Sequence, residues 1–149
     1  MSRVRSSLLF DLFAAGQQVR TLLVEAMRGS PLPPDEYAVY SGIFEFAPIT
    51  PTQLARVVGM PPTTLSHYLR DMRERGHVDE TRNPRDGRSQ LLTLSADGFA
   101  AHRGANQFFM RAYSLFVVGI DDEARVKDSL RAIEEAARHA ASEARTTVR

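Results

Sequence analysis

The segment that follows Pro61 carries short polar and basic side chains at helical spacing. Leu65 and Leu69 lie four residues apart, so both must face a protein core while the residues around them point outward. Hydroxyl, imidazole and guanidinium groups bind base edges and phosphates, and the first turns of a helix can enter a major groove. The residues that we expect to contact a duplex from this helix are Thr63, Thr64, Ser66, His67, Arg70 and Arg73.

A second basic motif, Arg85-Asp86-Gly87-Arg88, has the composition of a tight turn. An exposed arginine pair gains little from burial, but it suits a loop that reaches into a narrow, negatively charged minor groove. We expect Asp86 to hold Arg88 through a charge-assisted hydrogen bond and so to fix the shape of the loop. The expected contact residues of the turn are Arg85, Asp86 and Arg88. For both motifs the alternative is structural, namely a solvated polar helix face and a solvated charged turn.

The remaining residues form no catalytic or metal-binding pattern. The four histidines include no pair spaced four residues apart, and the sequence has neither a glycine-rich phosphate loop nor a Gly-x-Ser-x-Gly elbow. The absence of cysteine excludes disulfides, thiolate metal sites and thiol redox switches. We therefore expect no catalytic residue, no metal site, no cofactor and no enzyme activity.

The composition is that of an ordinary globular protein. The chain has 149 residues, of which 43% are hydrophobic and 25% are charged, enough for one domain with a buried core. No apolar run approaches the ~20 residues that cross a bilayer. Asp11 interrupts the apolar stretch near the N-terminus, which argues against a signal peptide. We expect a cytoplasmic protein with no membrane partner, and the net charge of +1 does not by itself indicate a partner.

Two short helices joined by a turn are predicted to position the first motif. We expect Thr50 to cap a helix that begins at Pro51, with Gln53 completing a capping box and Gly59 ending the helix. A second helix is expected over about residues 62–75. Two short helices in this arrangement predict a helix-turn-helix.

A β-hairpin is predicted to carry the arginine turn. Two β-prone runs, residues 77–82 and 89–94, flank the turn. Ser95 is expected to cap a following helix that ends near Gly119.

Long helices are predicted at both ends of the chain. Residues 4–28 carry an apolar face that is too wide for an isolated surface helix, and another helix follows Pro34. A last helix is expected after the acidic residues 121–123, where the helix dipole favours negative charge. Its apolar residues repeat at the four-three spacing of a coiled-coil seam. This seam consists of Val126, Leu130, Ile133, Ala137 and Ala140.

The stretch from Thr50 to Gly98 combines several short motifs. They are Leu54-Ala55, Thr64-Leu65-Ser66, Leu69, Met72, Arg75-Gly76-His77-Val78, Pro84-Arg85-Asp86-Gly87-Arg88-Ser89 and Leu92-Thr93-Leu94-Ser95-Ala96-Asp97-Gly98. In this order and spacing they resemble the MarR family of winged-helix regulators, and the arginine turn is their most specific part. The helical flanks match the family in layout rather than in motif.

The resemblance implies a mainly α-helical fold with a small β-hairpin wing (α+β). The expected organisation is one domain over residues 1–149, with a winged helix-turn-helix lobe at about 34–94 and dimerisation helices at about 4–28 and 95–145. A triangular homodimer would bind a pseudo-palindromic operator in double-stranded DNA, with half-sites about 34–36 Å apart. The implied function is a transcriptional regulator, more commonly a repressor.

Many members of the family are released from DNA by small aromatic or phenolic acids. Five aromatic residues lie in the segments that would surround such an effector, and they are Phe10, Phe13, Tyr37, Phe44 and Phe109. Aromatic residues at helical spacing are usually core residues, so we expect each to be buried and name no ligand residue. The absence of cysteine argues against the peroxide-sensing branch of the family.

Three features depart from the family pattern. Asn83 stands where aspartate is usual, His67 where arginine is frequent, and the charges of Arg70 and Asp71 look exchanged, whereas Arg85 transfers well. The exchange either alters a salt bridge only or weakens DNA binding. One alternative is therefore a winged-helix module that has lost DNA binding and serves protein contacts. A further alternative is another winged-helix family with a different dimer arrangement.

Overall fold

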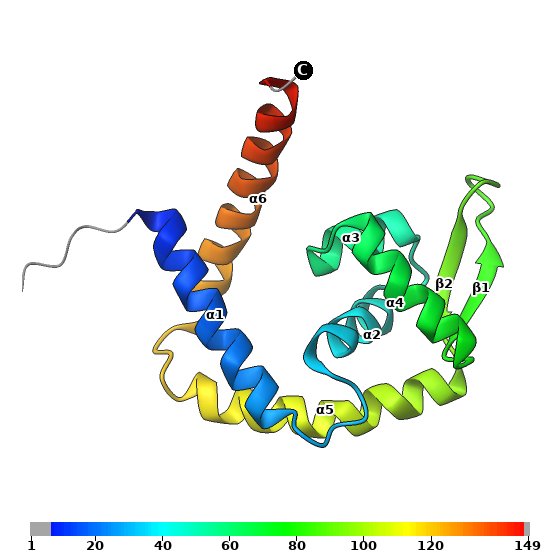
Figure 1. Cartoon of the computed structure of the whole chain (residues 1–149), viewed down its shortest axis with the longest axis horizontal. Helices are drawn as coiled ribbons and strands as arrows, with labels where there is room; N and C mark the ends of the chain where they lie inside the picture. The colour runs from blue at the N-terminus through cyan, green and yellow to red at the C-terminus, as the bar shows by residue number, and fades with distance from the viewer. Residues whose placement is uncertain (1–6, 148–149) are drawn as a thin grey trace, which may run out of the picture. The chain divides into compact units, whose positions relative to one another are not determined.

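The computed structural model describes residues 7–147, and its elements follow in the predicted order (Figure 1). The elements are α1 (Leu8–Ala26), α2 (Pro34–Phe46), α3 (Pro51–Val58), α4 (Pro62–Glu74), β1 (Val78–Arg82), β2 (Gln90–Leu94), α5 (Ala96–Val117) and α6 (Glu123–Thr147). The predicted mainly helical fold with one hairpin is confirmed. The chain divides into two compact units, Met1–Ala112 and Tyr113–Arg149, and the first contains all the candidate contact residues.

Local hydrogen bonds define α3 and the turn that follows it. Thr50 Oγ1 accepts from the backbone N–H of Gln53 at 3.2 Å, and the Thr50 N–H donates to Gln53 Oε1 at 3.0 Å. This reciprocal pair is the predicted capping box. Gly59 ends α3 with a φ of 70°, a left-handed conformation that glycine adopts without strain. The predicted helix-turn-helix is therefore confirmed.

One apolar core fixes α4 against α2, α3 and the hairpin. The core residues with almost no exposed surface are Leu32, Val39, Tyr40, Ile43, Leu54, Leu65, Met72 and Leu92. Burial of a side chain of leucine size contributes about 1.5–3 kcal/mol. Gly42 allows α2 and α3 to pack closely, because a Cβ at this position would lie 2.6 Å from Leu54 Cδ1.

The hairpin is a two-stranded antiparallel sheet that is anchored at its base. The pairing runs from Val78 opposite Leu94 to Arg82 opposite Gln90. Ile49 adds an isolated bridge, in which its N–H donates to the carbonyl oxygen of Leu92 at 3.3 Å and its own carbonyl accepts at 2.8 Å. The strands are each one residue shorter than expected, and after Val78 the residues of β1 are exposed.

The predicted cap of α5 is also present. Ser95 Oγ accepts from the Gly98 N–H at 3.1 Å and donates to the Gly76 carbonyl at 2.6 Å. The cap therefore ties the start of α5 to the end of α4.

The first helix is shorter than predicted. It ends at Ala26 instead of residue 28, because the chain turns through Gly29, whose φ is 84°, and places Met27 in the core. Residues 4–6 of the predicted helix lie outside the described residues.

The expectation that the five aromatic residues are core residues is wrong for three of them. Tyr37 is buried and Phe109 half-buried, but Phe10, Phe13 and Phe44 are 62%, 66% and 47% exposed. Helical periodicity predicts an apolar face, but it does not say whether the same chain covers that face.

The second unit contains the end of α5 and all of α6. Within α6, Val126 and Leu130 of the predicted seam are 40% and 47% exposed, and no residue of the helix is buried. In the described part of the chain, no helix combines the length and apolar composition that a bilayer-crossing segment requires.

Candidate nucleic-acid interface

Helix α4 presents a polar face to solvent, as predicted. Leu65 and Leu69 are each only 2% exposed and hold the helix on the core. We use the term polar face of α4 for the exposed residues Thr63, Thr64, Ser66, His67 and Arg70. Their outward orientation is confirmed, and their contact with DNA stays a prediction.

Two hydrogen bonds determine which donor and acceptor groups the polar face of α4 presents to solvent. Ser66 Oγ donates to the Pro62 carbonyl at 2.8 Å, so its hydroxyl remains available mainly as an acceptor. An Arg70 Nη atom lies 3.1 Å from His67 Nδ1. Because arginine has no acceptor, His67 Nδ1 must accept this bond, and the ring hydrogen then belongs to Nε2. His67 thus offers a donor, which suits acceptors such as guanine N7 and O6 or a phosphate oxygen.

Arg73 lies on α4 but is held by the hairpin. Its Nε donates to Glu80 Oε1 at 2.8 Å, and an Nη atom lies 2.6 Å from the same oxygen. The pair joins α4 to β1 and fixes the wing relative to the helix. A phosphate would have to compete with the Glu80 carboxylate for this guanidinium.

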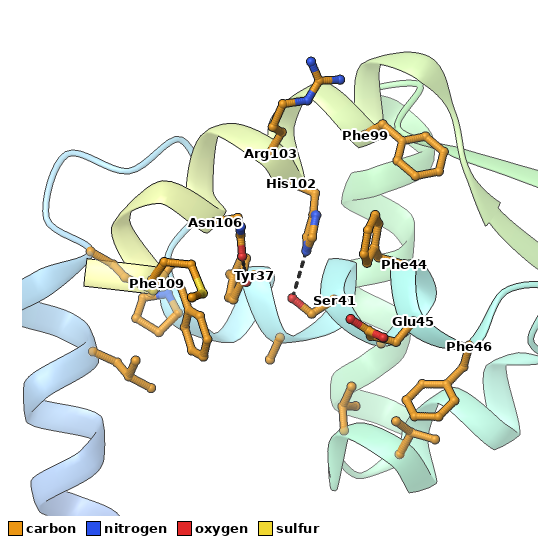
Figure 2. Close-up of a pocket in the computed structure, with 18 residues that line it drawn as sticks. Tyr37, Ser41, Phe44, Glu45, Phe46, Phe99, His102, Arg103, Asn106 and Phe109 are labelled. Atoms are coloured by element: carbon orange, nitrogen blue, oxygen red, sulfur yellow. Dashed lines mark hydrogen bonds between the residues drawn. The ribbon is translucent and has the colours of Figure 1, made fainter. Parts of the chain in front are cut away.

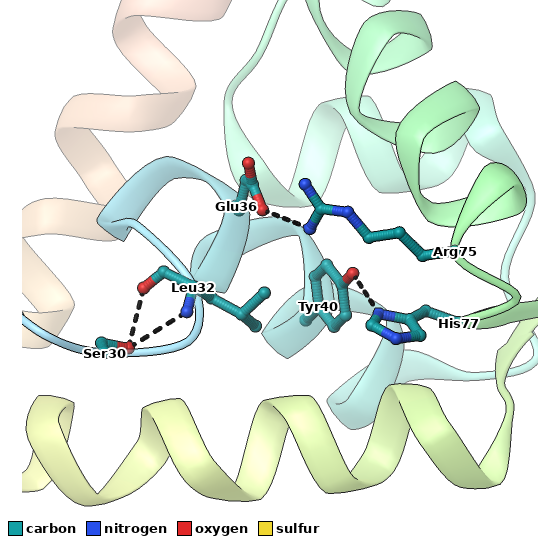
Figure 3. A network of polar contacts seen from close by, with 6 residues as sticks. All are labelled: Ser30, Leu32, Glu36, Tyr40, Arg75 and His77. Carbon is teal, nitrogen blue, oxygen red and sulfur yellow. Dashed lines mark hydrogen bonds and ion pairs between the residues drawn. The ribbon is translucent and has the colours of Figure 1, made fainter.

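The end of α4 is fastened to α2 by two further polar contacts (Figure 3). Tyr40 Oη lies 2.8 Å from His77 Nδ1, and Arg75 donates to Glu36 Oε2 at 2.9 Å. Burial raises the pKa of Tyr40, and the hydrogen bond to Glu36 raises the pKa of Arg75. Both groups therefore keep their protonated forms at neutral pH, and the contacts persist there.

A third connection reaches α4 from α1. Arg20 donates two hydrogen bonds to the Asp35 carboxylate, at 2.9 and 3.1 Å, in the bidentate arrangement that suits arginine. Tyr68 of α4 donates to the same carboxylate at 3.5 Å. Through Asp35, at the start of α2, the orientation of α4 is linked to α1.

The wing tip is shaped by side-chain to backbone hydrogen bonds. Asn83 Oδ1 accepts from the Arg85 N–H at 3.0 Å, and Asn83 Nδ2 donates to Ser89 Oγ at 2.9 Å. An ionised aspartate could accept the first bond but could not donate the second. Asn83, which departs from the family pattern, therefore bonds to residues both before and after the tip of the turn.

The predicted bond between Asp86 and Arg88 is present, but it involves a different group of Arg88. Asp86 Oδ1 accepts from the backbone N–H of Arg88 at 3.1 Å and not from its guanidinium. Within residues 7–147 neither Arg85 nor Arg88 forms an ion pair, and both are exposed. Asp86 therefore fixes the loop and leaves both arginine side chains available.

A third wing arginine was not expected. The Arg82 guanidinium packs over the tip, where a Cβ added to Gly87 would lie 2.8 Å from one of its Nη atoms. The sequence places Arg82 five residues before Gly87, but this spacing does not predict that its side chain packs over the turn. With Arg85 and Arg88, Arg82 adds a third positive charge to the wing.

The two residues of α4 whose charges look exchanged, Arg70 and Asp71, do not share a contact. Arg70 contacts His67, and within residues 7–147 Asp71 forms no ion pair. The exchange therefore breaks no ion pair inside the described chain.

A pocket with a volume of about 880 Å³ lies in the same unit, between α2, α5 and the end of α3 (Figure 2). His102 stacks between Tyr37 and Phe44, with ring centroids 5.3 and 4.5 Å away, and its Nε2 lies 3.1 Å from Ser41 Oγ. Burial lowers the pKa of His102, so the ring is neutral at neutral pH. Sequence reasoning missed this stack, because its members lie about 60 residues apart along the chain.

In the part of the chain that the structure describes, no three His, Asp or Glu side chains gather as a metal-ligand set. The distinctive features are an exposed polar helix behind a turn and an arginine-tipped hairpin on the same core. These features define the winged helix-turn-helix class.

Comparison with known proteins shows which winged-helix family the chain is similar to. Residues 43–89 match the family model described as MarR family, while no curated protein matches the chain. The predicted resemblance is therefore confirmed: residues 43–89 match the MarR-family model, and the chain has the fold of solved MarR-family structures.

Three solved structures illustrate the similarity. The Mycobacterium tuberculosis transcriptional regulator MosR in complex with DNA is 24% identical over 91% of this chain and 98% of its own, with a TM-score of 0.75. CouR from Rhodococcus jostii RHA1 bound to p-coumaroyl-CoA is 23% identical over 90% and 96%, with a TM-score of 0.76. Escherichia coli MarR in its apo form is 20% identical over 88% and 97%, with a TM-score of 0.67.

Proposed function

We propose that this protein is a cytoplasmic DNA-binding transcription regulator, a repressor rather than an enzyme. The observation that carries the proposal is the polar face of α4 beside a wing with three exposed arginines on one rigid core. The helix would enter a major groove and read base edges, while the wing would enter the adjacent minor groove. The contact residues would be Thr63, Thr64, Ser66, His67, Arg70, Arg73, Arg85, Asp86 and Arg88.

A homodimer on a pseudo-palindromic operator is the second part of the proposal. Apolar side chains along α1 and α6 are exposed in the single chain, among them Phe13 and Leu130. Pairing of two copies would remove such surfaces from water, at about 25 cal/mol per Å² of apolar area. A two-fold dimer binds half-sites about 34–36 Å apart.

The third part is release by a small aromatic effector. The pocket beside His102 has the size of known small-molecule sites, about 300–1,000 Å³, and contacts Val57 and Val58 of α3. A ligand that binds one position of α3 more tightly than another would shift the protein toward that conformation. The resulting change in operator affinity is limited by the difference between the ligand's affinities for the two conformations. CouR, a structural neighbour, has been solved with p-coumaroyl-CoA bound.

Selection of bound sites from random duplexes tests the function. The proposal predicts enrichment of an inverted repeat with half-sites one helical turn apart. Titration of the selected duplex, followed by fluorescence anisotropy, should show affinity falling by roughly a thousandfold between about 50 and 200 mM salt, because bound phosphates release counterions. A module retained for protein contacts would bind no duplex even at low salt, and that result would refute the proposal.

A further inference from the structure

Several aromatic side chains line the pocket. Tyr37, Phe44, Phe99 and Phe109 all line it, and Phe44 meets the Phe99 ring edge-on with centroids 5.9 Å apart. Aromatic rings present electron-rich faces, which attract cations and flat apolar groups.

The pocket lining contains one carboxylate, that of Glu45, and one guanidinium, that of Arg103. Glu45 lines the pocket one helical turn after Ser41, is exposed, and forms no ion pair within residues 7–147. Burial raises the pKa of Tyr37 and the Glu45 charge adds to this rise, while burial lowers the pKa of His102 and the same charge partly offsets the lowering.

The titratable groups nearest to Ser41 in this pocket, His102 and Tyr37, are uncharged at neutral pH. The buried His102 ring is neutral at neutral pH. The Tyr37 hydroxyl, whose pKa is raised mainly by burial, donates to Asn106 Oδ1 at 2.7 Å. Arg103 lines the pocket, but in Figure 2 its guanidinium extends away from His102 and Ser41.

We propose that this pocket binds a lipophilic organic cation with aromatic groups, rather than an aromatic acid. The aromatic faces and the Glu45 carboxylate both favour a cation, whereas an anion would face repulsion from both. This inference builds on the effector part of the proposed function, and it assigns the sign of the effector's charge.

A matched pair of probes tests the sign of the charge. Tetraphenylphosphonium and tetraphenylborate have nearly the same shape and opposite charge. Isothermal titration calorimetry of the full chain without DNA, in sodium buffer because potassium tetraphenylborate is insoluble, should show saturable binding of one phosphonium per chain and weaker binding of the borate. Tighter or equal binding of the borate, or no binding of the phosphonium, would overturn the proposal.

Two variants place the binding in this pocket. Glu45→Gln should weaken phosphonium binding by about threefold to tenfold and narrow the gap to the borate, because one exposed carboxylate is lost. Asp79→Asn is the matched control, since it removes the same charge from an exposed position on β1 that does not line the pocket. Equal effects of the two variants would also overturn the proposal.

A third variant tests the aromatic wall. Phe44→Leu keeps an apolar side chain but removes the ring that stacks on His102, and it should weaken the phosphonium more than the borate. A loss of the same size for both probes would show that the ring contributes only apolar area, and it would overturn the proposal that the aromatic wall selects a cation. Because the titration contains no DNA, its outcome is independent of whether the protein binds an operator.

Discussion

At the scale of single residues, the candidate interface differs from a generic basic surface in how its groups are oriented. His67 accepts from Arg70 through Nδ1 and therefore presents an Nε2–H donor, and the wing arginines stand on a loop fixed by Asn83 and Asp86. Fixed donors discriminate between bases, whereas mobile cations bind any phosphate.

His67→Ala should therefore change sequence preference more than overall affinity. The loss should amount to about 1–3 kcal/mol on the selected operator and much less on a scrambled duplex, because a base contact distinguishes the two. Anisotropy titrations on both duplexes provide the measurement, with His139→Ala on α6 as an exposed histidine control. Equal losses on both duplexes would exclude a role for His67 in base recognition.

Arg85→Ala should weaken binding to most duplexes by about 1–3 kcal/mol and reduce the salt slope by about one. The reason is that Arg85 is an exposed cation with no ion pair in the described chain. Arg138→Ala removes the same charge from α6 and should leave both quantities unchanged. Unaltered affinity of the Arg85 variant for every duplex would count against a DNA-binding wing.

His102 should make the folded state sensitive to mild acid. Burial lowers its pKa in the folded protein, although Glu45 opposes the change, so the unfolded chain binds the proton more readily. Stability therefore rises with pH between the lowered pKa and the ordinary one, and it is lost as the pH falls through this window. The thermal midpoint should fall by a few degrees more in the wild type than in His102→Gln between about pH 7 and 5. Parallel curves would assign the acid sensitivity to other groups.

The orientation of the polar face of α4 could be predicted at residue scale because it depends only on helical period. The hydrogen bonds of the wing tip could not be predicted, since the bond from the backbone N–H of Arg88 to Asp86 depends on loop geometry. The fold-back of Arg82 and the stack on His102 depend on the tertiary structure, which no short-range pattern encodes.

At the scale of elements, the best-predicted features were those with a local cause. The capping box of α3, its end at Gly59 and the Ser95 cap each follow from two or three neighbouring residues. The end of α1 was predicted two residues late, because the burial of Met27 in the core stops a helix whose periodicity continues. Contacts between elements, such as the ion pair of Arg73 with Glu80, could not be predicted from the sequence, because they depend on how the elements pack.

The ion pair between α4 and β1 offers a test of Arg73. Glu80→Gln should release the guanidinium toward a phosphate and steepen the salt slope by about one, since one more counterion is displaced. Asp79→Asn, on the neighbouring residue of β1, removes the same charge without releasing Arg73. Salt titrations of the two variants against one duplex give the comparison. If both steepen the slope equally, net charge is the cause and Arg73 does not contact DNA.

At the scale of the whole molecule, the proposed function requires a second copy of the chain. The evidence within one chain is the exposed apolar surface of α1 and α6, where residues such as Phe10, Phe13 and Leu130 meet no core of their own. Exposed apolar side chains gathered along a helix are typical of an interaction surface.

Ile133→Asp should dissociate the dimer, because it places a charge in the middle of the α6 seam, where burial without a partner is costly. Sedimentation velocity should show a dimer for the wild type and a shift toward monomer for the variant, at a chain concentration well above the wild-type dissociation constant. Ala124→Asp is the matched control, since nine residues are about two and a half helical turns and place it on the opposite side of α6. The affinity for the operator should fall when the dimer is lost, because a single lobe contacts only one half-site. A variant that remains dimeric would show that α6 associates through another face, and a wild type that sediments as a monomer would remove the two-fold binding mode altogether.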